Sequence, residues 1–197
     1  MRDNFVYRYG NSLYINLTNK CSNACDFCIR NNGDGIGDSG NLWLDREPSA
    51  SEVIERIKSF ENFDELVFCG YGEPTYKIDE LIEVALFAKQ NAIKTRLNTN
   101  GHGSMINGYD ITERLSGLID TVSVSLNSHS PEGYDGICHS EYGLEAFRVM
   151  LDFTKKCVER GVNTVMSVVD VSGVDVDKCR ALASDMGVEL RVREYIE

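Results

Sequence analysis

Strict alternation of apolar and polar residues is the feature of this sequence that most constrains its fold. Residues 13–18, 122–127 and 188–193 each alternate in this way, and helical apolar patterns run between such segments. Strands that alternate with amphipathic helices are typical of crossover units in a parallel sheet. Strands buried on both faces would instead carry near-continuous apolar runs. We therefore expect an α/β fold whose apolar strand residues face the helices and whose polar residues line an inner, ligand-holding face.

Edge strands with one solvated face give the same alternation, and for residues 188–193, as the last strand, both interpretations stay open. The chain has 197 residues, against ~250 for an eight-unit barrel, so about six strand-helix units fit. We expect a single domain, residues 1–197, forming a partial (β/α)6 barrel of parallel strands. Capping boxes at Ser49 with Glu52 and at Asp110 with Glu113 predict the starts of two helices.

Three cysteines, Cys21, Cys25 and Cys28, follow the first predicted strand with the spacing C-x-x-x-C-x-x-C. A 4Fe-4S cluster has one outer ligand for each iron, usually a cysteine thiolate. Three thiolates therefore leave one iron open to a small molecule. A structural zinc site needs closed four-coordination, and the candidates for a fourth ligand lie far along the chain. The spacing favours the cluster over zinc.

A glycine-rich turn follows the next short apolar strand, residues 66–69. Its sequence is G-Y-G-E-P, residues 70–74, which alone is typical of an ordinary strand-to-helix turn. Together with the cysteine spacing, and with Phe27 directly before the last cysteine, it resembles the radical S-adenosylmethionine enzymes. The resemblance implies that the open iron chelates S-adenosylmethionine. It also implies that reduction of the cluster cleaves the cofactor to a 5′-deoxyadenosyl radical, which abstracts a hydrogen atom from a substrate.

The same resemblance implies roles for residues at the strand ends. Gly72 would let the backbone approach the methionine end of the cofactor, and Glu73 would meet its ammonium group; the family usually has glycine where this chain has Tyr71. The segments T-N-G (99–101) and S-L-N (125–127) resemble positions that meet the ribose and the methionine carboxylate. Asparagine and serine at strand ends also simply make turns. The remaining cofactor-binding candidates are Phe27, Asn98, Asn100, Ser125 and Asn127.

Three arginines, Arg96, Arg191 and Arg193, fall in the polar register of their strands. A buried charge must be paired or must bind something. Salt bridges and an anionic group on the substrate both explain them. The carboxylates considered for such salt bridges are Glu73, Glu189 and Asp170.

Four further cysteines bring the total to seven, an odd number that argues against a disulfide framework. Cys157 and Cys179 lie on helical apolar stripes and are predicted core side chains. Cys69, at the end of a strand, and Cys138, in a predicted loop, have no assigned role.

Charge and hydropathy limit which classes of molecule this protein is expected to bind. Lys and Arg number 20 against 31 Asp and Glu, a net charge of −11, which argues against a nucleic-acid partner. Residues 1–10 contain no apolar stretch of signal-peptide length and no segment is long enough to span a bilayer, so we expect a cytoplasmic protein without a membrane partner. A reducing electron donor such as a flavodoxin or ferredoxin is the expected partner of the cluster.

Two segments, C-I-R-N (28–31) and N-L-W-L-D-R-E-P (41–48), resemble the small TatD-associated radical S-adenosylmethionine proteins. That narrower resemblance implies a functional link to a TatD-type hydrolase. Two alternatives stay open: an activating enzyme that makes a glycyl radical on a protein partner, and a non-catalytic iron-sulfur electron carrier. The glycine-rich segment 31–40 between them is either a mobile cover of the site or a disordered loop.

Overall fold

The computed structural model describes residues 4–195, and these form a curved seven-stranded sheet with the strand order β1-β2-β3-β4-β5-β6-β7. Strands β2 to β7 are parallel, each pairing with the next along the chain. The predicted six-unit α/β fold is confirmed. The strands are β1 (Val6–Tyr9), β2 (Ser12–Ile15), β3 (Glu65–Phe68), β4 (Lys94–Thr99), β5 (Thr121–Ser125), β6 (Asn163–Asp170) and β7 (Glu189–Glu194).

The seventh strand, β1, was not predicted. It pairs antiparallel with β2 across a two-residue turn, Gly10-Asn11, in which Gly10 takes a φ of 58°. Short hairpin turns need positive φ, which glycine adopts at no steric cost. The sequence of the strand, V-Y-R-Y, has no apolar alternation, so the turn was the one available signal.

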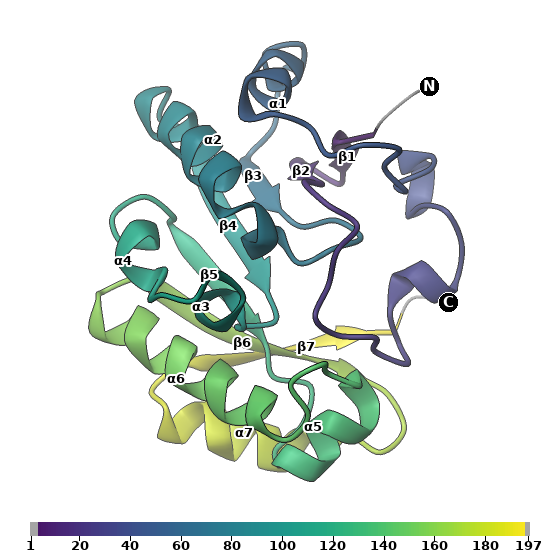
Figure 1. Cartoon of the computed structure of the whole chain (residues 1–197), viewed down its shortest axis with the longest axis vertical. Helices are drawn as coiled ribbons and strands as arrows, with labels where there is room; N and C mark the ends of the chain where they lie inside the picture. The colour runs from purple at the N-terminus through teal and green to yellow at the C-terminus, as the bar shows by residue number, and fades with distance from the viewer. Residues whose placement is uncertain (1–3, 196–197) are drawn as a thin grey trace.

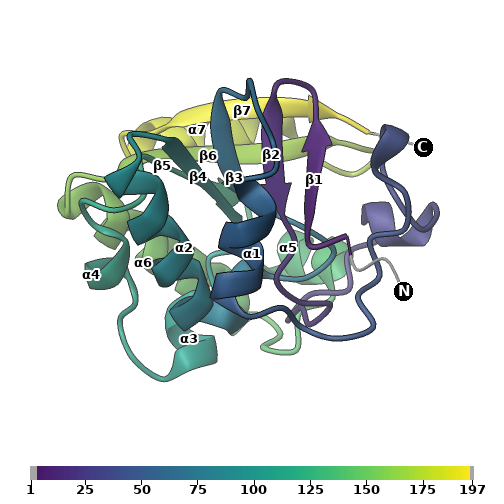
Figure 2. The same ribbon diagram turned by 90° about the horizontal axis from the view of Figure 1, so that it is seen from above.

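The helices lie on the outer face of the sheet (Figures 1 and 2). They are α1 (Ala50–Ile57), α2 (Ile78–Gln90), α3 (Gly103–Asn107), α4 (Thr112–Leu115), α5 (Pro131–Cys138), α6 (Glu145–Glu159) and α7 (Val176–Asp185). Short 3-10 turns η1 (Ile29–Asn31) and η2 (Gly37–Ser39) lie between β2 and α1, and η3 (Pro74–Lys77) precedes α2. The long segment that carries η1 and η2 runs along the open side between β1 and β7 (Figure 1), where the Asn32 amide contacts the Tyr195 hydroxyl at 3.1 Å.

The alternating strands orient as predicted. In β5, Val122 and Val124 are buried under the helices, whereas Ser123 and Ser125 share the inner face with their register partners Asn98 and Ser167. The last strand, β7, fits both interpretations. It is a sheet edge, and its Arg191 and Arg193 are exposed, yet Arg191 is the register partner of Ser167 and so belongs to the inner face.

One of the two predicted capping boxes is confirmed. Ser49 accepts from the Glu52 amide, and the Glu52 carboxylate reaches back to Ser49. The other prediction was wrong, because the Asp110 carboxylate accepts from the Thr112 amide and hydroxyl and the helix begins only at Thr112. Its proposed partner Glu113 instead pairs with Arg160, which also holds Asp110. Cys157 and Cys179 are fully buried in the core, as predicted.

None of the helices within residues 4–195 combines the length and apolar character that crossing a bilayer requires.

Candidate functional site

The cysteine loop, residues 16–28, crosses the ends of the parallel strands and is hydrogen-bonded in turn to the segments that follow β3, β4 and β5. The Lys20 carbonyl accepts from the Glu73 amide in the turn after β3, at 2.8 Å. The Ser22 hydroxyl accepts from the Asn100 side chain after β4, at 2.9 Å. The Ala24 amide donates to the Cys138 carbonyl at the end of α5, at 2.9 Å. The loop therefore lies at the carboxyl ends of the strands, where α/β sheets bind their ligands.

All three predicted cysteine ligands line one cavity of about 350 Å³. The cavity is also lined by Asn23, Ala24, Arg30, Asn31 and Trp43. Phe27, the fourth member of the predicted signature, is partly buried and packs against the main core, which anchors the loop between Cys25 and Cys28.

The environment of the thiols favours their protonated form when no metal is bound. Burial, followed by the nearby Glu73 carboxylate, raises the pKa of Cys21 to about 12. The neighbouring Cys138 thiol and burial raise the pKa of Cys25, and burial raises that of Cys28. Positively charged metal is what converts such buried thiols to thiolate ligands.

The arrangement of donors suits a cluster better than a single ion. Among residues 4–195, no three His, Cys, Asp or Glu side chains converge closely enough to hold one metal ion. A zinc site needs such convergence on one point. A four-iron cluster presents its irons at separate corners, so its cysteine ligands stand apart around it. The three cysteines of this loop fit that requirement.

The glycines of the G-Y-G-E-P turn are explained by close packing on the cysteine loop. A Cβ on Gly70 would lie 2.1 Å from the Asn16 amide oxygen. A Cβ on Gly72 would lie 2.3 Å from the Thr18 carbonyl oxygen and 2.5 Å from that of Lys20. Real Cβ atoms do not approach so closely, so both positions need glycine to let the turn pass under the loop.

Glu73 is the most heavily bonded residue of the site. Only 3 % of it is exposed. Its Oε1 accepts from the Thr75 amide and hydroxyl and from the Thr99 hydroxyl, and its Oε2 accepts from the Asn100 amide. These bonds join the turn after β3 to the turn after β4. Burial raises the pKa of Glu73 against the effect of these donors.

A buried polar network behind the cysteine loop was missed by sequence reasoning. The side-chain NH2 group of Asn100 donates to the Ser22 hydroxyl, which contacts His102 Nδ1 at 3.1 Å. The other ring nitrogen of His102 lies 3.2 Å from the Ala146 carbonyl and 3.4 Å from the Tyr134 hydroxyl. Burial lowers the pKa of His102 to about 4, so the ring is neutral. The T-N-G-H order was the signal available, because it puts His102 beside two polar strand-end residues.

Of the predicted cofactor contacts, Asn98 and Asn127 keep free acceptors. The side-chain oxygens of both are buried and have no hydrogen-bond partner among the described residues. Asn127 is 3 % exposed and takes a φ of 55°, a conformation that asparagine tolerates better than most residues. Asn100 differs, because its amide group is used within the polar network. Ser125 lies half-buried on the inner face beside Ser167.

The predicted salt-bridge partners of the arginines were wrong for Arg96. It pairs at 2.8 Å with Glu65, which begins the neighbouring strand, and its Nε is buried without a partner among residues 4–195. Arg193 donates to the Ser167 hydroxyl at 3.2 Å. Both guanidinium groups lie near enough to Cys69 to oppose the rise that burial causes in its pKa. Arg193 therefore brings positive charge to the inner face near Cys69, a residue left without a role from sequence, whereas the charge of Arg96 is balanced by Glu65.

The segment after the cysteines makes several contacts with the site. The buried Tyr71 donates its hydroxyl to the Gly33 carbonyl at 2.8 Å. Its ring packs edge-on against Trp43 at 5.1 Å, and the Arg30 guanidinium stands over Trp43 at 4.5 Å. Residues 41–48 continue along the start of the cysteine loop, where the side-chain NH2 group of Asn16 donates to the Leu42 carbonyl. These contacts place Gly33 and Leu42 beside the site, and both alternatives for residues 31–40, a mobile cover and a disordered loop, stay predictions.

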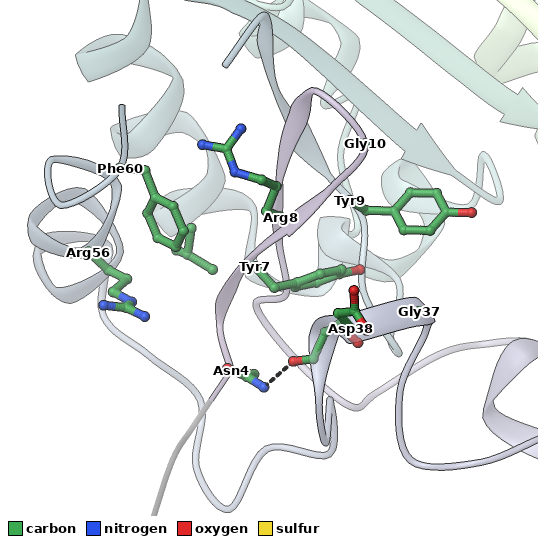
Figure 3. Close-up of a pocket in the computed structure, with 11 residues that line it drawn as sticks. Asn4, Tyr7, Arg8, Tyr9, Gly10, Gly37, Asp38, Arg56 and Phe60 are labelled. Carbon is green, nitrogen blue, oxygen red and sulfur yellow. Dashed lines mark hydrogen bonds between the residues drawn. The ribbon is translucent and has the colours of Figure 1, made fainter. Parts of the chain in front are cut away.

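Figure 3 shows a larger cavity, about 550 Å³, whose lining contains none of the cysteines. It is bounded by β1, by η2 and by the end of the α1 region, with Tyr7, Arg8, Asp38, Arg56 and Phe60 on its walls. Arg8 is committed to the carbonyls of Glu61 and Asn62. Because no cysteine and none of the unpartnered side-chain acceptors borders this cavity, the smaller one is the functional candidate.

Comparison with known proteins agrees with this geometry. The family model of the radical SAM superfamily matches residues 15–185. The GTP 3′,8-cyclase of Aquifex aeolicus (strain VF5) is 28% identical over 195 residues, which cover 94% of this chain and 56% of the cyclase. Streptococcus suis SuiB bound to S-adenosylmethionine superposes with a TM-score of 0.70 at 18% identity, covering 96% of this chain and 41% of SuiB. TYW1 with a lysine-pyruvate adduct gives a TM-score of 0.67 at 16% identity, covering 97% of this chain and 67% of TYW1.

The chain belongs to the radical SAM superfamily. It is therefore a radical SAM enzyme, and the predicted cofactors, a 4Fe-4S cluster and S-adenosylmethionine, are confirmed by the family. The chain spans about half the length of the cyclase and less than half of SuiB, so neither relative supplies its substrate.

Proposed function

We propose that this protein reductively cleaves S-adenosylmethionine and uses the radical on an anionic substrate. The observation that carries the proposal is the set of three cysteines around one cavity at the carboxyl ends of the strands. When bound, the cluster and its cofactor supply a 5′-deoxyadenosyl radical for hydrogen abstraction. Cys21, Cys25 and Cys28 hold the cluster as thiolates, and a flavodoxin or ferredoxin is the proposed electron donor.

The inner face supplies the contacts for S-adenosylmethionine. The free oxygens of Asn98 and Asn127 are buried acceptors, suited to the ammonium or the ribose hydroxyls of the cofactor. Leaving such groups unpaired costs about 1–3 kcal/mol each, so a ligand that donates to them gains that energy. Ser125 contributes a hydroxyl beside them. Gly72 and Glu73 place the turn, and Oε2 of Glu73 is the side of that carboxylate with the fewest protein donors.

The anionic substrate is inferred from the arginines. Arg193 puts positive charge on the inner face of a chain whose net charge is −11, and Arg191 shares that face at its edge, whereas Arg96 is paired with Glu65. Guanidinium groups bind carboxylate and phosphate through paired hydrogen bonds. Arg193 is exposed and, among residues 4–195, donates only to a serine hydroxyl, so it is the better candidate of the two inner arginines for substrate contact.

The narrower assignment to the TatD-associated proteins is proposed on the same site. Residues that carry that resemblance, Arg30, Asn31 and Trp43, line the cysteine cavity. In proteins of this subgroup, these residues would line the cavity beside the cluster. A functional link to a TatD-type hydrolase follows from the proposal, and co-purification of the two proteins tests it.

The central experiment is anaerobic purification followed by iron analysis. We expect about four irons per chain and loss of the cluster in Cys21→Ala, Cys25→Ala and Cys28→Ala. Cys157→Ala, equally buried but in the core, is the matched control and should keep its iron. Reduced protein should then convert S-adenosylmethionine to methionine and 5′-deoxyadenosine. Stoichiometric zinc without iron, or a reduced cluster that leaves S-adenosylmethionine intact, would refute the proposal.

A further inference from the structure

Arg30 is the one charged residue among those that line the cysteine cavity. It belongs to η1, the 3-10 turn that begins directly after Cys28. Among residues 4–195, no carboxylate lies within ion-pair distance of its guanidinium group, whose one contact is the ring of Trp43. A positive charge therefore borders the cavity without a negative side chain to balance it.

An aromatic contact fixes this guanidinium group in place. The Arg30 Cζ stands 4.5 Å from the centroid of the Trp43 ring. That ring packs edge-on against the buried Tyr71, with 5.1 Å between the ring centroids. Stacking on an aromatic ring uses one face of the guanidinium plane and leaves the N–H groups at its edge free. The arginine is therefore oriented before any ligand binds.

The tryptophan is itself tied to the cysteine loop. Asn19, in that loop, pairs with both main-chain groups of Leu44, the residue after Trp43. Its side-chain NH2 group donates to the Leu44 carbonyl at 2.8 Å, and its side-chain oxygen accepts from the Leu44 amide at 3.1 Å. These two bonds keep the ring, and with it the guanidinium group, on the wall of the cavity.

We propose that Arg30 is an anion-binding residue that holds a carboxylate or phosphate group in the cysteine cavity. The inference rests on the proposed function, because the same cavity is the proposed cluster site. The free edge of a guanidinium group donates paired hydrogen bonds to two oxygens of such a group. Two molecules of the proposed reaction can supply it: S-adenosylmethionine, through its methionine carboxylate, and the anionic substrate.

Balance of the cluster's charge is the alternative that a test must separate from anion binding. Three thiolates bring negative charge to the cavity, and a positive side chain nearby would offset it. Lysine would do so as well as arginine, but it offers neither a flat group to stack on Trp43 nor paired donors. Arg30→Lys and Arg30→Met together therefore distinguish the two roles.

The first test is isothermal titration calorimetry of the anaerobically purified holoprotein, with the cluster oxidised so that the cofactor is not cleaved. The ligands are S-adenosylmethionine and its decarboxylated form. If the cofactor supplies the anion, Arg30→Met should weaken binding of S-adenosylmethionine by about 10- to 100-fold and leave the decarboxylated form unchanged. Arg148→Met, the same substitution at an exposed position on α6, is the matched control and should change neither affinity.

The second test asks whether the substrate supplies the anion. Inorganic phosphate is added to holoprotein saturated with S-adenosylmethionine, and the fluorescence of Trp43, the single tryptophan of the chain, reports its binding. If the anion belongs to the substrate, Arg30→Met should need about 10- to 100-fold more phosphate for the same change. Arg148→Met should respond as wild type does, and all three proteins should bind the cofactor equally.

The outcomes separate this inference from the proposed function. Wild-type affinity of Arg30→Met for the cofactor and for phosphate would refute the inference alone. Equal weakening of both cofactor forms without an effect on phosphate would also refute it, because the shape of the cavity has then changed. If Arg30→Met loses its iron, the titrations on Arg30→Lys decide: weaker binding supports the inference, and wild-type affinity for every ligand refutes it. Wild-type protein without a 4Fe-4S cluster would refute the proposed function, and the inference with it.

Discussion

Replacing Glu73 by alanine tests whether this carboxylate is a structural joint or mainly a cofactor ligand. The side chain accepts from two backbone amides, those of Thr75 and Asn100, and from two threonine hydroxyls, in a place only 3 % exposed. The hydroxyls can rotate towards other acceptors, but the amides cannot. Two orphaned buried amides at about 1–3 kcal/mol each give a loss of about 2–6 kcal/mol. A typical domain has only about 5–15 kcal/mol in total.

The glutamine variant refines this estimate. Glu73→Gln keeps the volume, and its oxygen can replace Oε1, which meets three donors. Its NH2 group then faces the Asn100 amide, so one buried donor loses its acceptor, at a cost of about 1–3 kcal/mol. We therefore expect the urea concentration at the unfolding midpoint, followed by circular dichroism, to be highest for wild type, lower for Glu73→Gln and lowest for Glu73→Ala. Glu83→Ala, at an exposed position on α2, is the control and should change stability by less than about 0.5 kcal/mol.

One result would refute this reasoning. If Glu73→Ala unfolds at the wild-type urea concentration but binds S-adenosylmethionine more weakly, the carboxylate serves the cofactor and not the joint. If both stability and binding fall, while Glu73→Gln loses stability in proportion, the joint explains both effects.

Further predictions concern the turn, the buried histidine and the segment after the cysteines. Gly72→Ala must displace the cysteine loop, so it should lower the free energy of unfolding by about 1–3 kcal/mol and lower the iron content. Gly136→Ala, inside α5 with open space at its Cβ, is the control and should raise the free energy of unfolding by about 0.4–1 kcal/mol in the same urea assay. The folded pKa of His102, about 4, lies below the unfolded value of 6.5, so its contribution to stability is complete above pH 6.5 and is lost as pH falls through 4. The free-energy difference between wild type and His102→Gln should therefore change by about 3 kcal/mol over that range. Parallel curves of stability against pH for the two proteins would contradict the prediction. Tyr71→Phe removes the hydrogen bond to the Gly33 carbonyl, so it should lower the free energy of unfolding by about 1 kcal/mol and speed amide hydrogen exchange in residues 31–40. Unchanged exchange would show that this hydrogen bond does not hold the segment in place.

Much of the fold was predictable because its signals are local. Alternation in residues 122–127 fixes which side of β5 faces the helices, and a capping box fixes the start of α1. The second capping box failed because Asp110 accepts from Thr112, two residues on, and because Arg160, 50 residues away from Asp110, binds both carboxylates of the box. Sequence spacing cannot show such a distant competitor.

The site divides in the same way. Cys21, Cys25 and Cys28 lie within one loop, so their spacing was enough to place them together. Cys138 and His102 reach the loop through contacts between residues 80 to 114 positions apart, and neither carries a local motif. Asn100 shows the intermediate case. Its place beside the site was predicted from the strand end, but its use in the polar network became visible only with its partners.

Tyr71, where glycine is usual in the family, follows from the geometry of the turn. Gly70 and Gly72 meet the cysteine loop, where a Cβ has no room. The Tyr71 ring between them packs on Trp43, and its hydroxyl donates to the Gly33 carbonyl. The two glycines thus maintain the approach to the cluster loop, and the residue between them is free to hold the segment that forms the outer wall of the cavity.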